Sequence, residues 1–294
     1  MVLAFRKCFH YIGFRVRREA RHPESCFPGT VQKISPFDSG NATMRNKEER
    51  GNGMNELYIR GVRIDWANVP LDSYLREIPS LQGIEELKFD CPVTFFTGEN
   101  GSGKSTLLEA IAVSYGLNPE GGSSNYSFST YDSHSRLYDA VTLYKGIRHA
   151  GWSYFLRAES FYNVATAEEE YSKGPGGRPM RFHERSHGES FLALVRDFRG
   201  NALYLLDEPE AALSPQKQLE MLLEIRRLAV SGAQLFIATH SPILLGYPGA
   251  EILSFDGDVV RPVAYRDTES YRITNAFLTR YDRMIRDLFP EDSK

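Results

Sequence analysis

The sequence has few cysteines and no long apolar run. Its 294 residues include three cysteines, Cys8, Cys26 and Cys91, which are too few and too scattered for a disulfide framework or a zinc site. No stretch approaches the roughly 18 consecutive apolar residues that a membrane-spanning helix needs. These absences disfavour disulfide-stapled and membrane-inserted classes, and they make a reducing cytosol the default compartment. We therefore expect a cytoplasmic protein without membrane insertion.

The sequence also lacks an internal repeat, a heptad array and the Asn-Lys-x-Asp motif that reads a nucleotide base. The missing motif disfavours a GTPase. Hydrophobic residues make up 41% of the chain and charged residues 25%, which is ordinary for a globular protein with a substantial core. At roughly 150 residues per domain, the length allows two domains or one large α/β domain.

The net charge of −3 divides unevenly along the chain. Residues 1–53 hold 10 Lys/Arg and 5 Asp/Glu, a net of +5, which leaves 25 basic and 33 acidic residues, a net of −8, for residues 54–294. Such a shift marks a boundary, placed here close to Met54. The acidic body argues against a broadly basic surface for nucleic acid.

Three interpretations of residues 1–53 stay open. The arginines of this segment lie among aromatic residues, as in an arm that binds nucleic acid. A transit-type targeting segment is the second interpretation. The third is a dispensable extension, or an upstream start with Met44 or Met54 as the true first residue. Patterned sequence begins directly after Met54.

Along residues 54–294, segments with the apolar pattern of strands take turns with segments that have the apolar spacing of helices. Alternating or continuous apolar runs predict strands at 57–64, 87–89, 92–97, 152–158, 202–206 and 233–238, with a hairpin formed by 252–255 and 259–263. Helical spacing predicts helices at 104–115, 137–147, 189–198, 215–230 and 273–288. Strands that alternate with helices predict an α/β fold in which a mainly parallel sheet is flanked by helices.

A glycine-rich loop between the strand at 92–97 and the helix at 104–115 matches G-x-x-x-x-G-K-[ST]. Glycines let the backbone curl so that consecutive N–H groups point at phosphate oxygens. The lysine of this motif reaches the β- and γ-phosphates, and its serine hydroxyl binds Mg²⁺. The expected nucleotide-binding residues are Gly98, Glu99, Asn100, Gly101, Ser102, Gly103, Lys104, Ser105 and Thr106.

Two acidic residues, Asp207 and Glu208, end the apolar strand at 202–206. Side chains at the carboxyl ends of strands face the ligand crevice of an open α/β sheet. Asp207 is expected to hold Mg²⁺ together with Ser105, and Glu208 to polarise the attacking water as a general base or as a positioning group. The strand at 233–238 ends near His240, which is expected to reach the γ-phosphate or that water.

With these motifs in this order, residues 55–260 resemble the ABC-class ATPases, and among them the soluble SMC-like heads. They also resemble small bacterial AAA-type ATPases with a Ser-His-Gly-Glu-Ser-Phe element, seen here at 186–191. Residues 54–294 are accordingly expected to form one P-loop NTPase domain. The 80 residues from Thr106 to Arg185 are too few for long coiled-coil arms.

The resemblance implies further residue roles. Ser186 and Gly188 of the class signature would contact the γ-phosphate of ATP bound to the other subunit of a homodimer. Arg63 resembles an arginine that SMC-like heads place near the nucleotide. No glutamine lies between Gln82 and Gln216, so the glutamine that usually senses Mg²⁺ is missing. Its expected place contains Glu159 and Asn163.

The leading hypothesis is therefore Mg²⁺-dependent ATP hydrolysis that switches a soluble dimer between states. ATP and Mg²⁺ are the implied cofactors, and a nucleic acid or an unidentified protein is the further partner. DNA repair and phage defence are the contexts that the resemblance suggests. Two alternatives stay open, the ATP-binding subunit of a membrane transporter and a nucleotide-gated scaffold that does not hydrolyse ATP.

Overall fold

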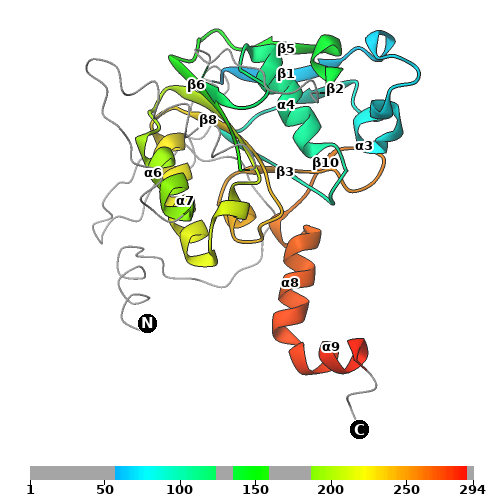
Figure 1. Ribbon diagram of the computed structural model, residues 1–294, viewed down its shortest axis with the longest axis vertical. Coiled ribbons are helices and arrows are strands. Elements are labelled where there is room, and N and C mark those ends of the chain that lie inside the picture. The colour runs from blue at the N-terminus through cyan, green and yellow to red at the C-terminus, as the bar shows by residue number, and fades with distance from the viewer. Residues whose placement is uncertain (1–56, 124–134, 159–186, 290–294) are drawn as a thin grey trace, which may run out of the picture.

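The computed structural model describes residues 57–123, 135–158 and 187–289 (Figure 1). Within them, the larger sheet has the strand order β10-β9-β3-β8-β7-β6-β4. Its strands are β3 (Val93–Thr97), β4 (Gly122–Ser123), β6 (Trp152–Arg157), β7 (Ala202–Asp207), β8 (Gln234–Ala238), β9 (Glu251–Ser254) and β10 (Arg261–Pro262). The central five strands are parallel, and the short strands β4 and β10 pair antiparallel at the edges. The predicted α/β fold with a mainly parallel sheet is therefore confirmed.

Helices cover both faces of this sheet. α4 (Lys104–Tyr115) packs on one face, and α6 (His187–Asp197) and α7 (Pro215–Val230) lie side by side on the other (Figure 1). Successive residues of a strand point to opposite faces. In β7, Leu203 and Leu205 accordingly join the core beneath α4, whereas Tyr204 and Leu206 join the core beneath α6 and α7. The continuous apolar runs of the sequence thus reflect strands that are buried on both sides.

A smaller sheet with the order β2-β1-β5 covers the α4 side. It consists of β1 (Ile59–Ile64), β2 (Glu86–Lys88) and β5 (Val141–Lys145), all antiparallel. The side chain of Gln234 on β8 joins the two sheets, because it accepts the Tyr58 and Ile59 N–H groups, each at 2.9 Å, and donates to the Ile59 carbonyl at 2.7 Å. A buried side-chain amide thereby replaces a missing strand partner.

The helix predicted at 137–147 is wrong. A short 3₁₀ helix, η3 (Arg136–Ala140), leads into β5 instead. Residues 141–145 alternate apolar and polar residues, and β1 offers them a free edge, so pairing outweighs the weak helical spacing of this segment. The predicted strand 87–89 and the hairpin of β9 and β10 are confirmed.

The predicted helix at 273–288 is two helices, α8 (Glu269–Thr279) and α9 (Tyr281–Leu288), which extend away from the sheet (Figure 1). The non-helical dihedral angles of Arg280 separate them. The described ranges also contain short elements: η1 (Trp66–Asn68), η2 (Tyr74–Glu77), α3 (Pro79–Gln82), η5 (Pro209–Ala212), η6 (Leu244–Gly246) and η7 (Tyr265–Asp267). Within the described ranges, no helix is long and apolar enough to cross a membrane.

Candidate nucleotide-binding site

The carboxyl ends of five parallel strands lie along one edge of the larger sheet. At or just after each of these ends lies a polar or glycine residue of the candidate site. β3 leads into the loop that begins at Gly98, β7 ends at Asp207, and β8 is followed by His240. β6 ends at Arg157, and Asp256 lies two residues after β9. Parallel pairing brings these five positions together from distant parts of the chain, at the edge where open α/β sheets bind ligands.

The loop between β3 and α4 depends on glycine at its turning points. Gly98, Gly101 and Gly103 have φ angles of 144°, 80° and 90°, a region that residues with a Cβ rarely adopt. A Cβ at Gly103 would also lie 2.7 Å from Cγ of Leu81. The loop turns directly into the N-terminus of α4, whose free N–H groups favour anions.

Lys104 is folded back over this loop. Its Nζ donates to the carbonyl oxygens of Gly98 at 2.8 Å and Glu99 at 2.7 Å, and the residue is only 3% exposed. Burial lowers the pKa of Lys104, and the carboxylates of Glu208 and Asp207 oppose that lowering. The ammonium group is therefore a buried donor inside the loop where the motif predicts phosphate.

Ser105 and Asp207 are joined although 102 residues separate them. The Ser105 hydroxyl donates to Oδ1 of Asp207 at 2.8 Å, and Asp207 is buried. A hydroxyl and one carboxylate suit Mg²⁺, which binds oxygen through few protein ligands and completes its shell with phosphates and water. The described residues contain no cluster of three or more His, Cys, Asp or Glu side chains that could hold a metal alone. Ser105 and Asp207 thus fit Mg²⁺ that arrives with a nucleotide.

Glu208 and His240 stand side by side at the open end of this edge. Nε2 of His240 lies 3.7 Å from Oε1 of Glu208, and the two side chains are 35% and 40% exposed. Burial lowers the pKa of His240, and the nearby Lys104 ammonium lowers it further, so the neutral imidazole is favoured. Glu208 has φ 49° and ψ 50°, a strained conformation for a residue other than glycine that costs about 1–3 kcal/mol. Strain of this kind is typical of functional positions.

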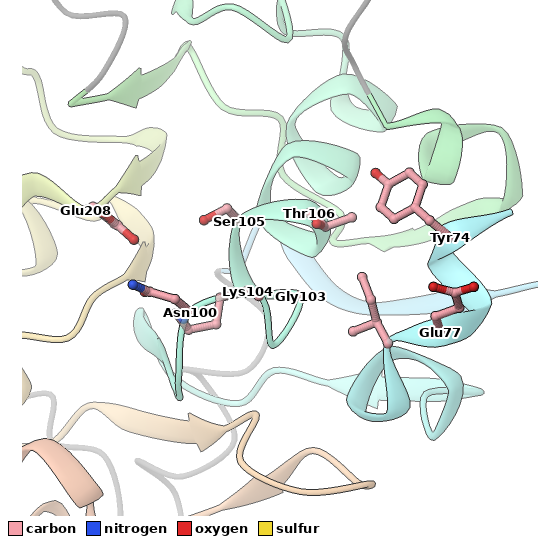
Figure 2. A pocket seen from close by; sticks show the side chains of 10 residues that line it. Tyr74, Glu77, Asn100, Gly103, Lys104, Ser105, Thr106 and Glu208 are labelled. Atoms are coloured by element: carbon pink, nitrogen blue, oxygen red, sulfur yellow. The ribbon is translucent and has the colours of Figure 1, made fainter.

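A cavity of about 420 Å³ runs beside the loop (Figure 2). Its lining residues are Tyr74, Glu77, Ile78, Asn100, Gly101, Gly103, Lys104, Ser105, Thr106 and Glu208. Figure 2 shows Glu208 at one end, Ser105 in the middle, and Tyr74 with Glu77 at the other end. No sequence motif marks Tyr74, Glu77 and Ile78, which come from η2 and its C-terminal cap, so these three lining residues were not predicted.

Other predicted residues lie apart from this cavity. Gly188, in the first turn of α6, is buried, and a Cβ there would lie 2.6 Å from the carbonyl oxygen of Ala212. Arg63 is exposed on β1 and does not line the cavity. Ser186, like Glu159 and Asn163, lies outside the described residues. The roles of Ser186, Gly188 and Arg63 stay predictions.

Asp256 is a residue of the candidate site that was not predicted from the sequence. Its Oδ1 accepts the Glu99 N–H at 2.9 Å, and its Oδ2 accepts the Ser254 hydroxyl at 2.9 Å, so it ties the loop to β9. Its negative charge also raises the pKa of Lys104 against the effect of burial. An acid just after an apolar parallel strand was the available signal, the same one that marked Asp207.

We expect Asp256→Ala to weaken nucleotide binding by about tenfold, because the loop loses a hydrogen bond to a charged acceptor worth about 1.5–3 kcal/mol. Asp256→Asn keeps an acceptor oxygen, so its nucleotide affinity should be closer to that of the unmodified protein. Titration calorimetry with a non-hydrolysable ATP analogue measures the difference. Asp258→Ala, two residues away and exposed, is the matched control. Equal affinities for Asp256→Ala and this control would contradict the assignment.

Comparisons with known proteins agree with the order of these motifs. Residues 74–148, which contain the glycine-rich loop, match a family model described as "AAA domain". Residues 176–246, which contain Asp207, Glu208 and His240, match a model described as "AAA domain, putative AbiEii toxin, Type IV TA system". Both halves of the site thus lie in spans that match AAA-type domain models. The two matches support the resemblance to P-loop ATPases of the ABC and SMC-like class.

Solved structures with some similarity include ATPase heads and transporter subunits. The SMC head domain from Thermotoga maritima is 14% identical with a TM-score of 0.37, and the match covers 71% of this chain and 100% of that one. The cbiO1 protein from Clostridium perfringens, part of the ABC transporter complex cbiONQ, is 16% identical with a TM-score of 0.40, over 78% of this chain and 99% of that one. No curated protein matches the chain significantly.

Proposed function

We propose that this chain is a Mg²⁺-dependent ATPase whose hydrolysis cycle switches a homodimer between closed and open states. The hydrogen bond from Ser105 to Asp207 carries the proposal, because it joins the glycine-rich loop to the acidic strand end. The glycine-rich loop, the Ser105 hydroxyl and the Glu208 carboxylate then line one cavity, and Asp207 is hydrogen-bonded to Ser105 beside it. Phosphoryl transfer needs little more than positioning and charge stabilisation, which these groups supply.

Each group has a distinct task in this proposal. The loop N–H groups and the Lys104 ammonium bind the oxygens of the β- and γ-phosphates. Ser105 and Asp207 hold Mg²⁺, which when bound neutralises charge that develops on the phosphates. Glu208 accepts the proton of the attacking water, and the neutral imidazole of His240 hydrogen-bonds that water or the γ-phosphate.

Dimerisation is proposed because the site of one chain is open. Glu208 and His240 retain 40% and 35% of their side-chain exposure, although hydrolysis requires exclusion of bulk water. A second copy that contributes Ser186 and Gly188 would cover them. The alternative of a transporter subunit and that of a scaffold without turnover have no specific support from the described residues.

DNA repair or phage defence is the proposed context. The description of the matched model over 176–246 includes a toxin–antitoxin system, which favours defence. The deciding experiment measures ATP binding and ATP turnover by the full chain with and without Mg²⁺, DNA and RNA. We expect turnover that requires Mg²⁺. Absence of both ATP binding and turnover under all these conditions would contradict the proposal.

The base of ATP is expected to lie against Tyr74. This ring is 56% exposed at the far end of the cavity from Glu208, which places it where the base would extend from the phosphates. Stacking of a base on an aromatic ring contributes about 1–3 kcal/mol. Tyr74→Ala should therefore weaken ATP and ADP binding alike by about tenfold, whereas Tyr74→Phe should bind normally. Fluorescence titration measures both, and equal affinities for the two variants would contradict the placement.

A further inference from the structure

Three charged side chains, two of them buried and one partly exposed, form a cluster behind the proposed Mg²⁺ site. Nη1 of Arg157 lies 2.8 Å from Oε2 of Glu109, and its Nε lies 3.5 Å from Oδ2 of Asp207. The side chains of Glu109 and Asp207 are each 8% exposed, and that of Arg157 is 22% exposed. Arg157 lies between the two spans that match AAA-domain models, so neither match assigns it a role.

The fold brings the three residues together from different elements. Arg157 ends β6 and pairs in parallel register with Asp207, the last residue of β7. Glu109 lies one helical turn after Ser105 on α4, so its side chain is on the same face of that helix. The other oxygen of Glu109 accepts the Ser135 N–H at 3.1 Å, which fixes its carboxylate from a third direction.

These contacts occupy both oxygens of Asp207. Oδ1 accepts the Ser105 hydroxyl, and Oδ2 faces the Arg157 guanidinium. A carboxylate that accepts a hydrogen bond at one oxygen and faces a guanidinium at the other is restrained in its rotation, and the planar guanidinium of arginine can face two carboxylates at once. Groups that orient metal ligands from behind typically affect metal affinity by 10–100-fold.

We propose that Arg157 is a positioning residue that orients Asp207 for Mg²⁺, and that Glu109 neutralises the guanidinium so that it does not repel the metal. The inference rests on the proposed function, since it concerns the same Mg²⁺ site. A lone guanidinium beside Asp207 would reduce the attraction for a cation, whereas the Arg157–Glu109 pair adds no net charge. The pair therefore orients the carboxylate at little electrostatic cost.

Substitutions at both positions separate orientation from charge. Arg157→Met leaves Glu109 and Asp207 unopposed, so charge alone would tighten Mg²⁺ binding, while loss of orientation would weaken it. The double variant Arg157→Met/Glu109→Gln removes the pair with no change in net charge, and such buried pairs are often replaced by neutral residues without loss of stability. Arg196→Met breaks the Arg196–Glu220 pair, also 2.8 Å long, on the surface between α6 and α7, and it is the matched control.

Two quantities are measured on the full chain. The first is the affinity for a fluorescent ATP analogue in EDTA, which measures nucleotide binding by the loop in the absence of metal. The second is the metal concentration at half saturation, from Mn²⁺ electron paramagnetic resonance with the analogue bound and from Mg²⁺ dependence of turnover. We expect the double variant and Arg157→Met to raise half saturation by about tenfold or more, with EDTA affinity unchanged. Glu109→Gln should raise half saturation too, because the positive charge of the Arg157 guanidinium beside Asp207 is then no longer neutralised.

Normal half saturation in the double variant would overturn the inference, because the pair would then act through charge alone or not at all. An equal loss of analogue affinity in EDTA and with metal would overturn it as well, since a merely structural role predicts that pattern. If Arg157→Met does not fold, the double variant and Arg157→Lys, which keeps the charge without the fork, decide the outcome by the same two measurements. Unmodified protein that binds no ATP would instead refute the proposed function.

Discussion

Glu208→Gln is expected to abolish ATP turnover and to leave ATP binding intact. Glutamine has nearly the same shape as glutamate but accepts no proton from water, so the contribution of a general base, about 10²–10⁴-fold in rate, is lost. Lys104, Ser105 and Asp207 are unchanged in this variant. Removal of one negative charge from the cavity also reduces repulsion of the triphosphate, so affinity should stay equal or rise.

The same variant should accumulate as an ATP-bound dimer. Closure depends on ATP and opening depends on hydrolysis in the proposed cycle, so blocked turnover leaves the closed state populated. Light scattering with and without ATP measures the mass, and phosphate release measures turnover. Glu220→Gln, an exposed glutamate of α7 outside the site, is the control. A monomer of Glu208→Gln that still hydrolyses ATP would refute both the base and the switch.

Local chemistry explains which parts of the site the sequence predicted well. The bounds predicted for α4 and α7 agree with the structure at both ends, because a glycine loop precedes one and Ser214 with Pro215 begins the other. Apolar strands that are buried on both faces are conspicuous in sequence, and an acidic pair at the end of one is easily located. These signals lie within a few consecutive residues, so no knowledge of the tertiary structure is needed to find them.

Features that depend on distant contacts were missed. Residues 141–145 form a strand because β1 pairs with them, and Tyr74 lines the cavity because η2 packs beside a loop some 25 residues later. Asp256 contacts Glu99 across 157 residues, and Arg157 contacts Glu109 across 48. No spacing rule connects such pairs in a single sequence. Site residues that lie together in one segment were therefore predicted best. Site residues that only the order of the strands brings together were predicted least well.

Lys104→Ala should reduce ATP affinity by at least about 100-fold, because removal of one member of a buried charge pair costs about 2–5 kcal/mol. Lys104 is nearly fully buried, and no other lysine or arginine lines the cavity, so no described neighbour replaces its ammonium. Titration calorimetry with a non-hydrolysable analogue measures the loss. Lys88→Ala, an exposed lysine of β2 paired with Glu86, should bind normally.

Lys104 also contacts its own loop, so a loss of ATP affinity in Lys104→Ala can have two causes, which a further measurement separates. Its Nζ binds two loop carbonyls, so the substitution can loosen the loop as well as remove a ligand for phosphate. Thermal unfolding without nucleotide separates these effects. A ligand role predicts similar melting temperatures for Lys104→Ala and the unmodified protein, with stabilisation by added ATP lost only in the variant. ATP stabilisation that persists in Lys104→Ala would show that other groups bind the phosphates, and the proposed site would then be wrong at its central residue.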